Sequence, residues 1–361
     1  MEAKRKTGLE WLTFPFILEA NAKRYPEKEA IVDYTYGKRF TYHESWIRTN
    51  KIANALIDLG IGDGDKVAYV GYNREELLHL LFGAAKIRAI VVPLNFRLIL
   101  SQWVSQVNHA DATILVCEDN LIEKIDPGRS DMPAVKHYIG YGDNVPSDWL
   151  NFEALVERAS DKDPDVEVRY NDLVSISYTS GTTGEPKGVM RTQSSWIAYS
   201  MANNWVQRTT PQSRIWTLMD LVHQGGIFVS ICSIFAGGTV VLLDRFDPQK
   251  ALEMIYRERL NDIYPTYVGF NMMTSLPQTE KDKYDMTHVK AAWSAGAVWP
   301  HERLMAARKL FPNARFAHGL LSSEGLFTVL ALQRYMQRHA RRGKLTFPMR
   351  EISPMVLHLY P

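Results

Sequence analysis

The chain has 361 residues, of which 46% are hydrophobic and 23% charged, values close to those of soluble globular proteins. This composition excludes long disordered, collagen-like and coiled-coil proteins, and the length suits two compact units or one large one. The formal net charge of +2 is too small for the uniformly basic surface that nucleic-acid-binding proteins often carry. The two cysteines, Cys117 and Cys232, lie too far apart in sequence for a metal-ligand motif. We therefore expect buried thiols in a reducing compartment, a cytoplasmic location and no nucleic-acid partner.

Short apolar runs bounded by turn residues alternate with helical patterns along most of the chain. In chain order, the expected elements are a helix at 44–59, a strand at 67–70, a helix at 75–86, and strands at 89–93, 113–117, 173–178, 239–243 and 291–294. Gly60 stands where the first helix needs a C-terminal cap. Strands that alternate with helices predict an α/β fold around a mainly parallel sheet.

One uncharged stretch, residues 225–243, is 19 residues long and therefore raises the possibility of a membrane-spanning helix. Its glycines are typical of a different structure. Gly237 and Gly238 interrupt the stretch, and the residues after them are short and β-branched. We therefore expect a buried helix, a glycine turn and a buried strand, and no transmembrane segment.

The strongest local signal is the segment 178–188, which follows an expected buried strand and reads Tyr-Thr-Ser-Gly-Thr-Thr-Gly-Glu-Pro-Lys-Gly. Glycines let the backbone turn so that successive N–H groups face one point, while short hydroxyls and a lysine add further groups that bind anions. The spacing differs from a Walker A loop, because Pro186 directly precedes the lysine. The candidate phosphate-binding residues are Thr179, Ser180, Gly181, Thr182, Thr183, Gly184 and Lys187. A solvated linker is the alternative interpretation.

This segment resembles the signature loop of the AMP-forming adenylating enzymes, the superfamily of acyl- and aryl-CoA synthetases, firefly-type luciferases and peptide-synthetase adenylation domains. The segments 41–44 and 84–95 are similar to core motifs of the same family, and the resemblance runs from about residue 17 to about residue 330. It implies the large N-terminal domain of that fold, with two mainly parallel sheets flanked by helices. No stretch resembles the family's final barrel or its C-terminal domain with a catalytic lysine, so we expect both to be absent.

The domain organisation follows from the same resemblance. We expect an AMP-binding domain over residues 1–330, with lobes at roughly 1–165 and 166–330. The polar segment 160–172 is typical of a connection between lobes, or equally of a surface loop within one. Residues 331–361 hold six Lys or Arg against one acid and are interpreted as an atypical basic tail.

The resemblance also implies roles for residues beyond the phosphate loop. His223, in the segment 218–226, matches the histidine that lies beside the bound carboxylate in the family, and we interpret it as catalytic together with Lys187. The segment 292–297 resembles the strand and turn that shape the adenine and acyl pockets. Its candidate nucleotide-binding residues are Ser294, Ala295, Gly296 and Ala297. Ala295 replaces the usual glycine, a difference that matters only if the position needs a positive φ.

The last motif lies at 318–324. It aligns with a family motif that contacts the nucleotide and supplies a carboxylate to magnesium, with Ser323 as the hydroxyl partner and Glu324 as the catalytic, metal-binding acid. The alignment relies on the glutamate, because Mg²⁺ prefers hard carboxylate oxygens.

The resemblance implies a two-step reaction. A carboxylic acid, fatty or aryl, attacks ATP to give an acyl-adenylate and pyrophosphate, and coenzyme A then displaces AMP. The expected cofactors are ATP and Mg²⁺, with coenzyme A as co-substrate. Two alternatives remain open: a catalytically silent fragment that at most binds nucleotide, and a peptide-synthetase-type domain with an acidic anchor for an amino group near Asp220.

Overall fold

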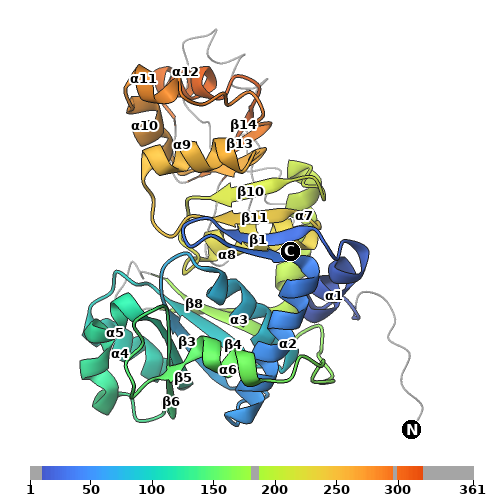
Figure 1. Ribbon diagram of the computed structural model, residues 1–361, viewed down its shortest axis with the longest axis vertical. Helices are drawn as coiled ribbons and strands as arrows, with labels where there is room; N and C mark the ends of the chain where they lie inside the picture. Colours follow the sequence, from blue (N-terminus) through green and yellow to red (C-terminus); the bar gives the residue numbers. More distant parts are fainter. Residues whose placement is uncertain (1–9, 180–186, 296–298, 320–361) are drawn as a thin grey trace, which may run out of the picture.

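The computed structural model describes residues 10–179, 187–295 and 299–319. It contains two seven-stranded sheets with helices between and around them (Figure 1). This arrangement confirms the expected α/β class with two mainly parallel sheets flanked by helices. The expected basic tail at 331–361 lies outside the described residues.

The first sheet has the strand order β7-β6-β5-β3-β4-β8-β9. All its neighbours are parallel except the final pair, β8 and β9, which form an antiparallel hairpin. In chain order the strands are β3 (Lys66–Val70), β4 (Ile90–Leu94), β5 (Ala112–Glu118), β6 (His137–Tyr141), β7 (Leu150–Asn151), β8 (Leu173–Tyr178) and β9 (Gly188–Thr192).

Helices cover both faces of this first sheet, because side chains alternate between its faces and both sets are apolar. On one face lie α4 (Leu100–His109) and α5 (Asp119–Ile125), followed by a short 3₁₀ segment, η1 (Asp126–Asp131). On the other face lie α1 (Phe14–Arg24), α2 (Tyr42–Asp58), α3 (Glu75–Lys86) and α6 (Phe152–Arg158).

The second sheet has the order β14-β13-β12-β10-β11-β1-β2, and only β1 and β2 are antiparallel. Its strands are β1 (Glu29–Asp33), β2 (Lys38–Thr41), β10 (Arg214–Thr217), β11 (Thr239–Leu242), β12 (Asp262–Tyr264), β13 (Ala291–Ala295) and β14 (Arg315–Gly319). Its helices are α7 (Gln193–Gln207), α8 (Gln224–Phe235), α9 (Pro248–Arg257), α10 (Tyr267–Ser275), α11 (Gln278–Lys281) and α12 (His301–Leu310). Helix α8 contributes to the core shared with the first sheet, whereas α9, α10 and α12 cover the opposite face.

The two sheets do not correspond to the expected lobes at 1–165 and 166–330, because each sheet contains strands from both halves of the chain. Strands β1 and β2 come from the N-terminal part of the chain but pair with β11 in the second sheet, whereas β8 and β9 return to the first sheet. The irregular segment 160–172 joins α6 to β8, so it is a loop on the first sheet. The reason is that β1 pairs with β11 and β8 pairs with β4, and both partners are far away in the sequence.

Local signals in the sequence predict several elements well. Helix α2 begins with a capping box in which the Thr41 side chain and the Glu44 side chain satisfy each other's backbone N–H groups, and Gly60 follows it with a φ of 78°. The stretch 225–243 forms most of α8, a turn with Gly237 at a φ of 75°, and β11. Among the described helices, none has the length and apolar character needed to cross a bilayer.

Candidate functional site

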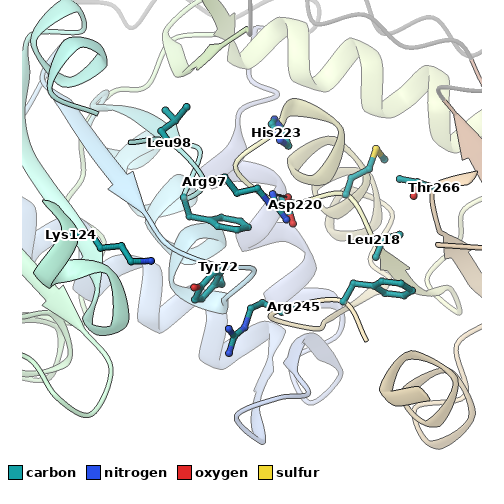
Figure 2. Close-up of a pocket in the computed structure, with 12 residues that line it drawn as sticks. Tyr72, Arg97, Leu98, Lys124, Leu218, Asp220, His223, Arg245 and Thr266 are labelled. Atoms are coloured by element: carbon teal, nitrogen blue, oxygen red, sulfur yellow. Dashed lines mark hydrogen bonds and ion pairs between the residues drawn. The ribbon is translucent and has the colours of Figure 1, made fainter. Parts of the chain in front are cut away.

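A pocket of about 940 Å³ opens where the carboxyl ends of strands from both sheets face each other (Figure 2). Ligands commonly bind at this end of parallel strands, because the loops there vary without disturbing the sheet. One wall follows β3, β4 and β5, and the other follows β10, β11 and β12. The lining residues are Tyr72, Phe96, Arg97, Leu98, Lys124, Leu218, Met219, Asp220, His223, Arg245, Phe246 and Thr266.

His223 reaches this pocket because β10 ends in a tight loop that leads directly into α8. The His223 N–H donates to the Asp220 carbonyl at 2.9 Å, and His223 is the residue immediately before the helix. A Cβ on Gly226 would lie 2.4 Å from the Asp220 carbonyl oxygen, so only glycine allows the loop to fold onto the first turn of the helix. The Gly-Gly pair after the histidine therefore has a packing role that fixes the position of the imidazole.

The surroundings of His223 favour the neutral form of its imidazole. Burial lowers its pKa, the nearby Asp220 carboxylate opposes this, and the Arg97 guanidinium lowers it further. Arg97 and Asp220 form an ion pair across the pocket, joining the loop after β4 to the loop after β10 (Figure 2). Because the pair neutralises Asp220, a carboxylate that enters beside His223 meets an uncharged ring and little net repulsion.

Three cationic side chains lie along the wall of the pocket. Arg97 stacks on Phe96, with 4.2 Å between the guanidinium carbon and the ring centroid, and Arg245 stacks on Tyr72 at 4.9 Å. Lys124 extends from α5 on the same side as Tyr72 (Figure 2). With one carboxylate lining residue, Asp220, against these three cations, the pocket favours anionic ligands.

The predicted phosphate loop connects β8 to β9 at the carboxyl end of β8. Thr179 is partly buried, and its N–H donates to the Lys187 carbonyl at 3.0 Å, which closes the base of the hairpin. The side chain of Lys187 is exposed. The remaining candidates of this loop lie outside the described residues: Ser180, Gly181, Thr182, Thr183 and Gly184.

The predicted adenine-side segment ends β13, next to β12 in the second sheet. Ser294 is buried, and its hydroxyl oxygen accepts a hydrogen bond from the Trp299 indole at 3.3 Å. Ala295 pairs in register with Gly319 and is not among the described residues with positive φ, so the alanine causes no backbone strain. Gly296, Ala297, Ser323 and Glu324 lie outside the described residues.

The structure thus places Thr179 and Ser294 to Ala295 at the carboxyl ends of β8 and β13, Lys187 beside Thr179 at the start of β9, and His223 in the loop between β10 and α8. Of these, only His223 lines the pocket described above. The sequence motifs did not point to Lys124 or Arg245, and they pointed to Asp220 only as an amine anchor. Lys124 and Arg245 lie in a helix and a loop that directly follow the predicted strands 113–117 and 239–243, and this position is the signal that could have found them.

Among the described residues, three carboxylates lie close enough together to hold a metal ion: Glu75, Glu76 and Glu153. The ammonium of Lys38 already lies among them, at 3.2, 2.9 and 3.6 Å from their oxygens. A protein cation therefore fills this group, and we assign no metal to it.

Comparisons with known proteins identify the family. The sequence model described as "AMP-binding enzyme" matches residues 18–358, which includes most of the basic segment after residue 330. The chain is 29% identical over 301 residues to an indoleacetate–CoA ligase of Aromatoleum aromaticum, covering 82% of this chain and 56% of the relative. It is 31% identical over 343 residues to the long-chain-fatty-acid–CoA ligase FadD13 of Mycobacterium tuberculosis, covering 92% and 64%.

Solved structures share the fold. The N-terminal domain of FACL13 from Mycobacterium tuberculosis superimposes with a TM-score of 0.80 at 24% identity, covering 90% of this chain and 80% of that domain. The anthranilate CoA ligase AuaEII, in complex with anthranoyl-AMP, gives a TM-score of 0.81 at 21% identity, covering 87% and 60%. The chain spans a little over half to about two thirds of the length of the curated relatives it matches.

Proposed function

Because the chain belongs to the AMP-binding enzyme family, we propose that it activates a carboxylic acid with ATP, as the first half of acid–CoA ligation. The observation that supports this most is the pocket itself. It combines cationic walls with His223, which burial keeps neutral, at the facing carboxyl ends of two sheets. A fatty or an aryl acid would enter beside His223.

The chemistry needs positioning more than a protein nucleophile. A free carboxylate resists attack because its leaving group would be oxide. In the proposed first step, a carboxylate oxygen attacks the α-phosphorus of ATP and the bond to pyrophosphate breaks, which leaves an acyl-adenylate. In the second step the coenzyme A thiol attacks the acyl carbon, loses its proton and releases AMP. Phosphoryl transfer of this kind depends on oriented donors and neutralised charge.

Each candidate residue has a part in this proposal. Lys187 and the backbone of 179–184 would hold the ATP phosphates, and His223 would orient the acid as a neutral hydrogen-bonding group. Ser294 to Ala297 and Ser323 would contact the nucleotide. Magnesium held at Glu324, which lies outside the described residues, would supply charge neutralisation. The two free, buried cysteines suit a cytoplasmic location.

A second candidate is a chain that binds nucleotide without turnover. The observation in its favour is coverage, because the chain spans only 56% and 64% of the two ligases compared above. The peptide-synthetase alternative has less support, because Arg97 already neutralises the Asp220 carboxylate that would anchor a substrate amine.

Acid-dependent exchange of radiolabelled pyrophosphate into ATP separates these candidates. We expect exchange with at least one acid from a panel of fatty, aryl and amino acids, and a loss of at least about tenfold in Lys187→Ala, equivalent to one lost charge-assisted contact. Lys250→Ala, an exposed lysine on α9, is the matched control and should keep full activity. Absence of exchange above the Lys187→Ala level with every acid would contradict the enzyme proposal.

A further inference from the structure

A buried arginine links the predicted phosphate loop to the histidine of the pocket. Arg191 lies on β9, four residues after Lys187, and is 4% exposed. Its Nε and Nη2 both donate to the Gln224 Oε1, at 3.2 and 3.0 Å. Gln224 is the first residue of α8 and directly follows His223. One pair of side chains therefore joins the strand that leaves the phosphate loop to the helix start that presents the histidine.

Both ends of this link are fixed by their surroundings. The guanidinium carbon of Arg191 lies 5.0 Å from the ring centroid of Tyr199 and 5.9 Å from that of Trp196, both on α7. Arg191 is also paired in register with Ser175 on β8. Gln224 is buried, and two donors from a charged group orient its amide. The first turn of α8 therefore cannot shift relative to β9 without breaking these hydrogen bonds.

The loop before α8 is held on both sides by arginines from the first sheet. Arg97 pairs with Asp220 at one end, and Arg191 holds Gln224 at the other. His223 lies between these two points and lines the pocket (Figure 2). The Arg97 side chain is 59% exposed, so water screens its ion pair, whereas the hydrogen bonds of Arg191 are buried. Arg191 is therefore the firmer of the two contacts that fix the histidine.

We propose that Arg191 is a positioning residue for acid activation: through Gln224 it fixes His223 relative to the phosphate loop, so that ATP and the acid favour each other's binding. This inference rests on the proposed function and adds a coupling between its two ligand sites. A ligand that orders one end of the link also orders the other end, so the second ligand pays less to bind.

The geometry of the reaction gives this link its importance. Attack on the α-phosphorus requires the carboxylate oxygen and the nucleotide to be held together, and a misplacement of about 1 Å can cost about 100-fold in rate. The link spans four residues of strand, or about 13 Å, between Lys187 and Arg191. Arg191 therefore acts at a distance from the phosphates, through Gln224, and not as a group that touches the reacting atoms.

The test measures acid binding by titration calorimetry with and without saturating α,β-methylene-ATP, whose α–β bridge cannot be cleaved, so that it does not depend on turnover. The probes are phenylacetic acid and hexanoic acid, one aryl and one fatty. We expect the analogue to tighten binding of at least one acid about fivefold or more, the usual lower bound for coupled sites. Arg191→Met and Gln224→Leu should each reduce this factor to less than about twofold, because each removes the link.

Further variants show whether the two residues act as one unit. The double variant Arg191→Met with Gln224→Leu should lose no more coupling than either single variant. Gln224→Glu keeps the oxygen position that Arg191 uses and loses an N–H group that has no partner within the described part of the chain, so it should retain the coupling. Arg191→Lys keeps the charge but only one donor centre, so it should retain part of the coupling.

Arg214→Met is the matched control. Arg214 also forms partly buried hydrogen bonds, but it begins β10, at the opposite end of that strand from the pocket. It should lower the melting temperature and leave the coupling factor unchanged. Failure of both acids to bind, no coupling in the unmodified chain, full coupling in both Arg191→Met and Gln224→Leu, or an equal loss in Arg214→Met would overturn the inference.

Two provisions keep the result decisive. If Arg191→Met does not fold, Arg191→Lys and Gln224→Leu decide. Pyrophosphate exchange is measured separately: coupled binding without exchange would contradict the proposed function and support this inference, whereas exchange with full coupling in Arg191→Met and Gln224→Leu would contradict this inference alone.

Discussion

Two buried polar regions of this molecule differ in how well their side-chain atoms are hydrogen-bonded. Glu75, at the start of α3, is fully buried, and both of its carboxylate oxygens are bonded: Arg48 donates to them at 2.8 and 3.1 Å, and His79 lies at 2.5 Å. Asn203 on α7 is almost as buried, yet neither of its amide atoms has a partner within the described ranges. Burial alone therefore does not separate the two regions.

The difference teaches which buried polar groups hold elements together through ion pairs and which do not. The Glu75 region joins α2, α3, α6 and β2 through ion pairs of Lys38 and Arg48 with Glu75 and Glu153. Removing one member would leave the others buried and unpaired, which is costly. The Asn203 region holds no ion pair: its amide lies beside the Tyr264 hydroxyl and the Cys232 thiol and lowers the pKa of each against the larger effect of burial.

The largest expected effect is on Glu75. Glu75→Ala should lower the free energy of unfolding by about 3–5 kcal/mol, because it removes the buried carboxylate that Arg48 and His79 share. Urea unfolding measures this. The control is Glu19→Ala, which removes an exposed pair with Lys23 and should cost less than about 1 kcal/mol. Similar losses in the two variants would contradict a structural role for the Glu75 region.

A second test probes how tightly the neighbouring tyrosines pack. A Cβ on Gly71 would lie 1.7 Å from the Tyr141 hydroxyl and 2.9 Å from the Tyr69 hydroxyl. Gly71→Ala should therefore destabilise the protein by about 1–3 kcal/mol through overpacking. Gly62→Ala provides the comparison, because a Cβ there meets no atom within 4 Å. Equal melting temperatures for the two variants would show that the tyrosines have room to move.

The charged region also predicts a pH dependence. Burial and the adjacent Glu75 raise the pKa of Glu76 to about 7, against the opposing charges of Arg74 and Lys38, and burial raises the pKa of Asp33 to about 6. The folded state therefore holds protons between pH 4.5 and 7 that the unfolded chain has lost, so stability should fall as pH rises through this window.

Glu76→Gln sharpens this prediction. The variant should flatten the decline between pH 6 and 7 and keep the part that Asp33 causes below pH 6. Melting temperatures recorded across that range measure both parts. A decline between pH 6 and 7 as steep as in the unmodified protein would assign it to another group.

The smallest expected effect is on Asn203. Asn203→Leu should change the free energy of unfolding by less than about 1 kcal/mol, because the amide makes no hydrogen bond of good geometry and leucine keeps the branch at Cγ. Thermal unfolding without ligand measures it. A loss of more than about 2 kcal/mol would place Asn203 with the structural polar groups and remove the contrast between the two regions.

Sequence reasoning succeeded where the signal is local. The helix predicted at 75–86 has the same limits in the structure, because its apolar face and its flanking strands are continuous in sequence. His223 was placed at a helix start from the two glycines that follow it, and Gly226 does permit the close approach to Asp220. These predictions needed only the neighbouring residues.

Sequence reasoning failed where residues that contact each other are far apart in the sequence. Arg97 and Asp220 are 123 residues apart and meet only because two sheets face each other across the pocket. The lobe division near residue 165 relied on the polar segment 160–172, and no local signal indicated that β1 pairs with β11. Likewise, nothing local to Asn203 distinguishes it from Asn204, whose amide donates to the Cys232 carbonyl at 2.9 Å. Such distinctions depend on packing between distant elements.

The most direct test of the central proposal is binding of ATP by titration calorimetry, compared between the unmodified chain, Lys187→Ala and Lys250→Ala. We predict saturable 1:1 binding that Lys187→Ala weakens at least about tenfold, the loss expected for one charge-assisted contact, and that Lys250→Ala leaves unchanged. No saturable binding, or equal affinity in the two lysine variants, would contradict a nucleotide site at the carboxyl end of β8.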